Sequence, residues 1–240
     1  MHPIERLRYI ARSDGGDPRN LVVETASALR ALGVDPAGLV VACRRIVERH
    51  PTSGPLWWLC AHMLTDTDPN AVARRLAAEI VDDPTVDVLA DALPLDATVC
   101  VVGWSDLIGE ALLRRDDLSV LAVGSEDSAD LLTGAVLAAD LVLIEALAAS
   151  SSEVLAAPGG RAAASVAYCS EVPVWVVLGV GRRLPEVGFR SLVDRVPNEG
   201  VADVVPLGLC SHIATPLGVV AVSEASTAAD CPVALELTRL

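Results

Sequence analysis

The chain has 240 residues, enough for one large domain or two small ones with a sizeable core. Hydrophobic residues make up 52% of it but aromatic residues only 3%, so Ala, Val and Leu must build the core. Such a core suits helices packed on a Val-rich sheet. The formal net charge of −14 argues against nonspecific binding to nucleic acid, because neutralising phosphates requires a basic stripe that this sequence lacks.

The basic residues and the cysteines exclude further classes of chemistry. All 18 basic residues are Arg, which excludes a Schiff base, a lysine general base and a Walker-type phosphate loop. The six cysteines have no metal-ligand spacing and are typical of buried thiols in a reducing compartment. The N-terminus has no apolar signal core, and no stretch reaches the ~20 apolar residues of a membrane span. We therefore expect a cytoplasmic protein that uses no metal or cofactor and does not bind a membrane.

An Asp-Pro pair recurs in the first third of the chain, at Asp17, Asp35 and Asp68. Asp can cap the free N–H groups of a helix while Pro occupies the first helical position, where its missing donor costs nothing. Apolar periodicity predicts helices over residues 21–32, 39–47 and 72–80, and a shorter apolar segment over 56–64 predicts another. We therefore expect residues 1–92 to form a helical N-terminal lobe.

From Thr98 onward, short β-rich runs alternate with amphipathic segments. Strands are expected over residues 98–103, 119–124, 141–145, 172–178, 202–206 and 219–222, with helices over 105–114 and 127–137. Such alternation predicts right-handed βαβ units and a mostly parallel sheet. The expected fold class is α/β, with the helical lobe followed by a Rossmann-like lobe over residues 93–240.

Residues 138–177 predict a ligand site, because they combine a strand, a loop, a helix that opens with glycines and a second strand. Loops at the carboxyl ends of parallel strands are where ligands bind, and the pair Gly159 and Gly160 leaves backbone N–H groups free for an anion. The same pair could simply turn the chain. Arg161 follows directly and is the expected phosphate-binding side chain, although an exposed Arg at a helix start is also ordinary.

Several local sequences resemble those of the superfamily that unites the alpha, beta and delta regulatory subunits of eukaryotic initiation factor 2B with methylthioribose-1-phosphate isomerase and ribose-1,5-bisphosphate isomerase. His50-Pro51-Thr52 is similar to the family's Arg-Pro-Thr segment, with His50 at the position of a phosphate-contacting Arg. Residues 101–110 are similar to the strand and turn that hold the isomerases' catalytic Cys, and Gly103 stands at the Cys position.

The resemblance continues in the second half of the chain. Ala139-Asp140 is similar to part of the Gly-Ala-Asp-Arg motif, which makes Asp140 the match to the isomerases' catalytic acid. Residues 154–160 resemble the segment that carries Asn-Lys and Gly-Thr, but Ala156-Ala157 replaces Asn-Lys while Gly159 keeps the Gly. Family isomerases use the Cys and the Asp to move protons between adjacent sugar carbons. Gly103 cannot replace the thiol, and the missing Lys and Arg weaken phosphate binding.

Each remaining candidate has a structural alternative. Asp140 could cap a strand end, and Glu145 could face the ligand or accept a backbone N–H. Ser105 would be a good N-cap, and Trp104 beside it could flank a ligand or cover the core. Ser125 is expected at the same edge of the sheet. His50, with Thr52 after it, ends a helix and could only complement the helix dipole.

Two functions follow from these residues and this resemblance. The first is an initiation factor 2B-like, noncatalytic binder or sensor of a phosphorylated sugar or nucleotide in a crevice between the lobes. The second is an aldose-ketose isomerase that acts on a sugar 1-phosphate through Asp140 and a partner other than Cys. The expected partners are the phosphorylated small molecule and a second copy of the chain, since relatives pair through the Rossmann-like lobe and the Val- and Leu-rich C-terminal strands offer apolar surface.

Overall fold

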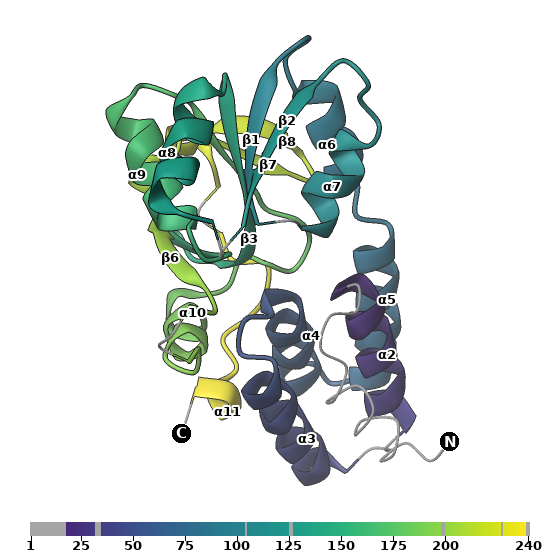
Figure 1. Cartoon of the computed structure of the whole chain (residues 1–240). Helices are drawn as coiled ribbons and strands as arrows, with labels where there is room; N and C mark the ends of the chain where they lie inside the picture. The colour runs from purple at the N-terminus through teal and green to yellow at the C-terminus, as the bar shows by residue number, and fades with distance from the viewer. Residues whose placement is uncertain are drawn as a thin grey trace. The chain divides into compact units, whose positions relative to one another are not determined.

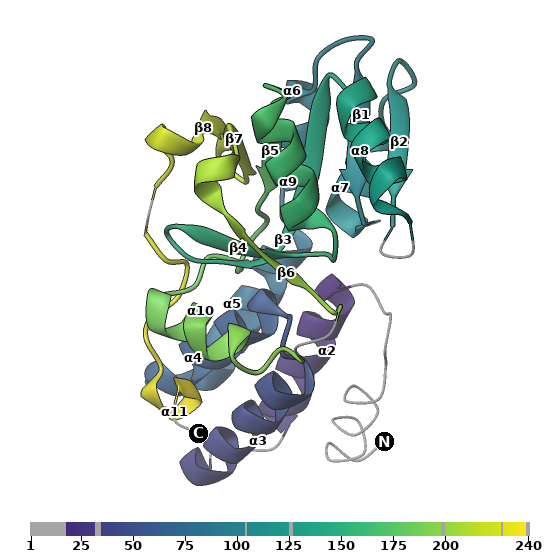
Figure 2. The ribbon, with the colours of Figure 1, turned by 60° about the vertical axis from the view of Figure 1, so that its left-hand side comes forward.

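The computed structural model describes residues 18–31, 35–103, 105–124, 127–197, 200–226 and 228–238 (Figure 1, with a second direction in Figure 2). The chain divides into two compact units. Unit 1 contains Met1–Asp83, Val180–Val196 and Ala228–Leu240, and unit 2 contains Pro84–Gly179 and Pro197–Thr227. No helix among the described residues is long and apolar enough to cross a membrane.

Unit 1 is built from helices, as expected for the N-terminal part of the chain. They are α2 (Pro18–Ala31), α3 (Pro36–Arg49), α4 (Gly54–Thr65), α5 (Pro69–Val81), α10 (Glu186–Val193) and α11 (Leu235–Thr238). The Asp-Pro signal is confirmed at two helix starts, where Asp35 and Asp68 accept the N–H groups of Gly38 and Ala71, each at 3.0 Å. Asp17 lies outside the described residues.

Helix α4 supplies much of the core of unit 1, because it is apolar on nearly every side. Trp57 and Trp58 are both buried in it. The guanidinium of Arg195 lies 5.4 Å from the centre of the Trp57 ring, and the Trp58 Nε1–H donates to the carbonyl of Asp230 at 3.2 Å. Segments from the end of the chain therefore complete the helical core that the first eighty residues begin.

Unit 2 is organised around a sheet whose strands are β1 (Thr98–Val102), β2 (Ser119–Val123), β3 (Leu141–Ala149), β4 (Glu153–Ala156), β5 (Val174–Val177), β6 (Asp203–Pro206), β7 (His212–Thr215) and β8 (Gly218–Ala221). The strand order is β2-β1-β3-β5-β7-β8, and β4 pairs with β3 and β6. The pairs from β2 to β7 along this path are parallel, whereas β4 and β8 pair antiparallel. The expected α/β class with a mostly parallel sheet is confirmed.

Both faces of this sheet are covered. The helices are α6 (Thr85–Ala92), α7 (Asp106–Leu112), α8 (Ala129–Ala138) and α9 (Gly160–Cys169). Cys100 and Val102 of β1 pack in a core with α8 and α9, whereas Val99 and Val101 pack in a second core with α6 and α7. This alternation explains why the strand is apolar throughout, since neither of its faces meets water.

The compact units differ from the division at residue 92 expected from the sequence. Helix α6 belongs to unit 2, because Val86 and Leu89 pack in the core that contains β1 and α7. Residues 180–196 and 228–240 belong to unit 1. Strands β4 and β7 were also missed by the sequence analysis, since neither shows a clear period-2 pattern.

Candidate functional site

The carboxyl end of β1 and the middle of β3 bring two of the expected site residues together. Val102 pairs with Ile144 in register, so Gly103 and Glu145, the next residue of each parallel strand, are neighbours at this edge. Ligands bind at this edge in open parallel sheets. The strand expected over residues 141–145 continues to Ala149, so Glu145 lies within β3, and its part with Gly103 in a ligand site remains a prediction.

Gly103 is fixed here by its backbone and by lack of space. Its φ is +70°, and a Cβ added to it would lie 2.6 Å from the Cβ of Ala157. Its N–H donates to the carbonyl of Val123 at 2.8 Å. Ala157, which follows β4, thus closes over the position where the resemblance places the isomerases' Cys, and no side chain fits there without rearrangement.

Glu145 uses its carboxylate as an internal cap. The side chain is only 6% exposed, and its Oε2 accepts the N–H groups of Leu107 and Ile108 at 3.1 and 3.3 Å. These donors belong to the first turn of α7, where an anion is favoured by the unpaired N–H groups and the helix dipole. Ser105 occupies the N-cap position, but its hydroxyl makes no capping bond and is buried without a hydrogen-bond partner among the described residues.

A second carboxylate fills the expected anion site at the start of α9. Asp203 of β6 accepts the N–H groups of Gly159 and Arg161 with Oδ2, at 2.9 and 3.3 Å. The N–H of Gly160 donates to the carbonyl of Ala157 at 3.1 Å. The expectation that Gly159 and Gly160 offer free N–H groups to a ligand is therefore wrong, because the chain supplies the anion itself.

Arg161 remains available at this helix end. Its side chain is exposed, and its guanidinium has no hydrogen bond or ion pair within the described part of the chain. The sequence analysis missed Asp203, because β6 brings it to α9 by pairing antiparallel with β4, with Ala156 opposite Asp203. No local pattern around residue 203 indicates that partner.

Asp140 lies at the other edge of the sheet, which corrects the expectation that it joins Gly103. It precedes β3, and its Oδ2 accepts the N–H of Thr98, the first residue of β1, at 2.8 Å. Its own N–H donates to the carbonyl of Thr98 at 2.8 Å. Asp140 therefore caps a strand end, which was the alternative considered for it. The length of β1 separates it from Gly103.

Cys100 offers no substitute thiol at the carboxyl edge. It is buried in the core on the α8 and α9 face of β1, and this burial raises its pKa to about 11. A thiol with that pKa is almost fully protonated near neutral pH, so it is a poor nucleophile and a poor base.

The other expected residues are Trp104, Ser125, His50 and Thr52. Trp104 and Ser125 lie outside the described residues. His50 is the C-cap of α3 and Thr52 follows it in the turn before α4, both in unit 1. Their part in a ligand site remains a prediction.

The edge therefore contains two helix starts, each bonded to an internal carboxylate, and one exposed guanidinium. Glu145 holds the start of α7 and Asp203 holds the start of α9. Oε2 of Glu145 and Oδ2 of Asp203 each accept two backbone N–H groups. This arrangement ties each helix start to a strand, α7 to β3 and α9 to β6.

Comparison of the fold with solved structures gives close matches. The chain superposes on eIF2B beta from Chaetomium thermophilum with a TM-score of 0.69 and 14% sequence identity, covering 92% of this chain and 88% of that one. For the translation initiation factor eIF-2B of Pyrococcus horikoshii OT3 the TM-score is 0.67 at 12% identity, covering 91% and 96%. The fold is that of the initiation factor 2B subunits.

The same fold occurs in an enzyme. Superposition on 5-methylthioribose 1-phosphate isomerase from Pyrococcus horikoshii OT3 gives a TM-score of 0.60 at 13% identity, covering 91% of this chain and 84% of that one. No family model matches the chain, and no curated protein matches it in sequence. The likeness confirms the fold inferred from the resemblance, and at these identities it does not decide between a subunit and an enzyme.

Proposed function

We propose that this protein is a noncatalytic binding protein with the initiation factor 2B fold, and that it recognises a phosphorylated sugar or nucleotide at the carboxyl edge of the unit 2 sheet. The observation that supports the noncatalytic role is the state of Glu145. It is the acid that lies beside Gly103, and its carboxylate is buried and bonded to the start of α7. A group held in this way stabilises the fold instead of moving protons.

Arg161 is the residue we expect to bind the phosphoryl group. Its guanidinium is exposed and can offer two parallel N–H donors to phosphate oxygens. The charge of Asp203 at the same helix start opposes a second anion, so we expect weak binding by the wild-type protein. Support for the ligand class comes from the likeness to an isomerase named for a sugar phosphate.

The binding proposal is tested by calorimetric titration with ribose 5-phosphate. Arg161→Ala should weaken binding by about 1.5–3 kcal/mol, the usual cost of losing a charge-assisted hydrogen bond. Asp203→Asn keeps an acceptor oxygen for the backbone N–H groups but removes the opposing charge, so it should tighten binding. Arg114→Ala changes another exposed Arg of unit 2 and should leave the affinity unchanged. Equal affinities for wild type and Arg161→Ala would refute the role of Arg161.

The noncatalytic role has a separate test. Purified protein incubated with methylthioribose 1-phosphate or ribose 1,5-bisphosphate should produce no ketose above the enzyme-free rate, because the acid and the thiol of the isomerases have no counterpart at the carboxyl edge. The position of Asp140 at the amino edge argues against the isomerase alternative. Robust turnover that is abolished by Asp140→Asn would overturn the noncatalytic assignment.

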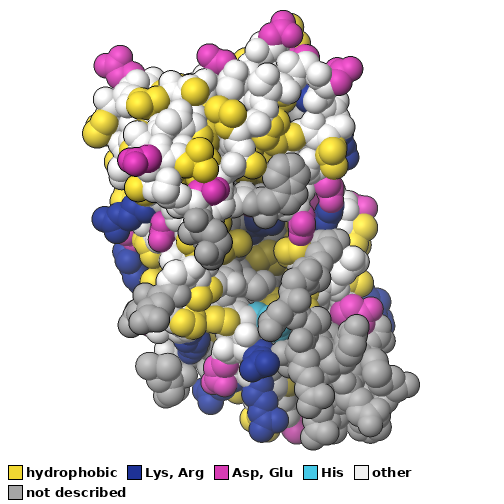
Figure 3. Space-filling view, in the orientation of Figure 1, with side chains coloured by type: hydrophobic (Ala, Val, Ile, Leu, Met, Phe, Trp, Pro, Cys, Tyr) yellow, Lys and Arg dark blue, Asp and Glu magenta, His cyan; other side chains and the backbone are white. Residues whose placement is uncertain are grey.

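We further propose that the protein forms a homodimer through unit 2. On the face of unit 2 that Figure 3 shows, hydrophobic side chains are exposed at several places. Leu131 and Leu137 of α8 are 53% and 57% exposed, and Val120 of the neighbouring edge strand β2 is 41% exposed. A related solved structure is described as a tetrameric eIF2B-beta2-delta2 complex. Apolar side chains on a helix beside an open sheet edge suit a twofold interface, which would also cover the unpaired strand.

A further inference from the structure

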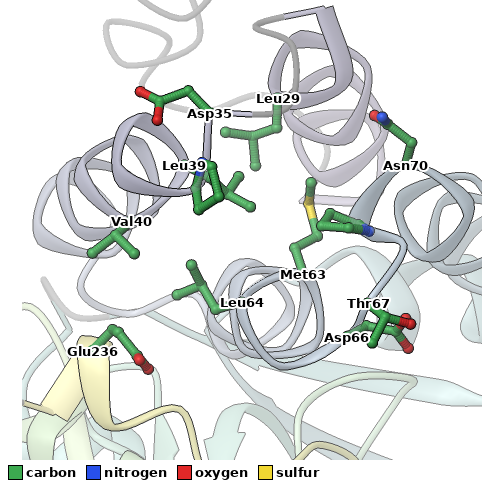
Figure 4. A pocket seen from close by; sticks show the side chains of 12 residues that line it. Leu29, Asp35, Leu39, Val40, Met63, Leu64, Asp66, Thr67, Asn70 and Glu236 are labelled. Atoms are coloured by element: carbon green, nitrogen blue, oxygen red, sulfur yellow. The ribbon is translucent and has the colours of Figure 1, made fainter.

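A pocket in unit 1 is separate from the edge described above. It has a volume of about 310 Å³ and is formed by α2, α3, α4, α5 and α11 (Figure 4). This volume is at the lower end of the range of about 300–1,000 Å³ that is usual for small-molecule sites. The pocket is therefore large enough for a small organic molecule.

The floor of the pocket is apolar. Leu29, Leu39, Met63 and Leu64 come from three helices and surround one space in Figure 4. Leu29 and Met63 are buried in the core, whereas Leu39 and Leu64 are half-buried. The floor is thus supported by the core through Leu29 and Met63 and is accessible at Leu39 and Leu64. Such a surface favours an aliphatic ligand.

The rim of the pocket is acidic. Asp35, Asp66 and Glu236 line it, and it contains no Arg. Two helix C-termini, those of α2 and α4, and two helix N-termini, those of α3 and α5, lie at the pocket, so their dipoles largely offset one another and the carboxylates set its charge. Asp35 and Asp66 already accept backbone N–H groups, from Gly38 at 3.0 Å and Asp68 at 2.9 Å.

Glu236 is the rim carboxylate best placed to bind a ligand. In the described part of the chain its carboxylate has no hydrogen bond or ion pair. Arg44 anchors the residue through its backbone, because Arg44 Nε donates to the Glu236 carbonyl at 2.7 Å. The helix is therefore held in place while the carboxylate remains available to a cation.

We propose that this pocket binds a small amphipathic cation, an aliphatic amine whose hydrocarbon body lies among Leu29, Leu39, Met63 and Leu64 and whose ammonium group lies at the rim beside Glu236. The rim carboxylates favour a cation and disfavour an anion of the same shape. The apolar floor favours a ligand with a hydrocarbon chain, because burying that chain away from water lowers the free energy. The combination selects an alkylammonium ion over an alkyl carboxylate or a small polar amine.

The two methionines of the chain allow a direct test, because only Met63 lies in the pocket and the other is Met1. Protein labelled with ¹³C at the methionine methyl groups is titrated with hexylammonium chloride. The Met63 methyl resonance should shift in a saturable way while the Met1 resonance does not. Sodium hexanoate has the alkyl chain without the positive charge, and methylammonium chloride has the charge without the chain. Both should leave the two resonances unchanged.

Two exposed glutamates provide matched variants. Glu236→Gln should weaken hexylammonium binding about fivefold, as expected for the loss of an exposed ion pair. Glu48→Gln should have no effect, because Glu48 lies at the opposite end of α3 from the pocket. The proposal is overturned if hexylammonium leaves Met63 unchanged, if hexanoate shifts it equally, or if Glu236→Gln binds as tightly as wild type. Binding of only larger apolar partners, such as a peptide, would likewise refute it.

Discussion

At the residue scale, the surroundings of Gly103 explain why this position cannot hold a reactive side chain such as the isomerases' Cys. Its backbone lies in the left-handed region at φ +70°, and Ala157 lies where its side chain would project. Either feature alone favours glycine, and together they prevent any residue with a reactive side chain from occupying the site without moving the chain. The loss of the thiol is therefore built into the packing of β1 against the segment that follows β4.

This packing gives a prediction for two glycines in the same unit. Gly103→Ala should lower the free energy of unfolding by about 2 kcal/mol or more, because the new Cβ meets Ala157 in a strained backbone conformation. Gly134→Ala should raise it by about 0.5–1 kcal/mol, because Gly134 lies in α8 with no atom within 4 Å of its Cβ position. Urea denaturation of the two variants checks both, and equal effects would contradict the account.

Ionisation of Asp230 opposes folding. Burial raises its pKa, and this effect outweighs the N–H of Arg183 and the nearby charges of Arg183 and His62, which lower it. The folded state therefore holds this proton more tightly than the unfolded chain does. The resulting stabilisation is fully present below the unfolded pKa of about 4 and is lost as the pH rises through the raised folded pKa.

The consequence is a pH-dependent difference between wild type and Asp230→Asn. Asn cannot ionise, so the free energy of unfolding of the variant should increase relative to wild type as the pH rises above about 4, and the difference should level off above the folded pKa. Chemical denaturation at a series of pH values between 4 and 8 measures this difference. If the difference in free energy of unfolding between Asp230→Asn and wild type shrank with rising pH, the pKa of Asp230 would be lowered by folding instead of raised.

At the element scale, the starts of α7 and α9 are held by distant carboxylates instead of by their own N-cap residues. Ser105 and Gly159 occupy the N-cap positions, and neither caps through a side chain. Glu145 and Asp203 accept the N–H groups in their place. Each helix is thereby tied to a strand, and the N–H groups that could bind a phosphate are already used.

The cap of α7 can be tested with one pair of variants. Glu145→Gln should lower the free energy of unfolding by about 1–2 kcal/mol, because it removes a buried charge from two backbone donors and from the helix dipole. Ser105→Ala should change it by less than about 0.5 kcal/mol, since the hydroxyl makes no bond among the described residues. Thermal unfolding distinguishes the two, and a larger loss for Ser105→Ala would show that the serine is the real cap.

At the scale of the whole molecule, charge and exposed apolar surface act in opposite directions. A formal net charge of −14 keeps copies of the chain apart, whereas the apolar side chains of α8 and β2 favour pairing. Salt screens the repulsion but not the apolar contact. The proposed dimer should therefore be more stable at higher ionic strength.

Light scattering at micromolar concentration should give about twice the 25.0 kDa mass of one chain. Leu131→Asp should shift the mass to that of a single chain, because it places a charge in the proposed interface. Leu113→Asp changes a residue that is 84% exposed near the end of α7 and should leave the dimer intact. A mass of 25.0 kDa for the wild-type protein at every salt concentration would exclude the dimer.

The sequence by itself determined the elements whose causes are local. Asp35-Pro36 and Asp68-Pro69 specify helix starts through their own side chains and rings, and the alternating apolar runs after Thr98 specify a mostly parallel sheet. Each of these features depends on short-range sterics, capping or periodicity, which a single sequence displays directly.

Only the tertiary structure decided which polar groups meet. Asp203 reaches Gly159 across 44 residues of sequence, through the antiparallel pairing of β6 with β4. Asp140 falls at the amino edge because β3 begins directly after it, and α6 joins the sheet because its apolar face packs against β1 and α7. Such partners are selected by long-range packing and by the need to satisfy buried N–H groups, and a linear pattern of residues does not encode them locally.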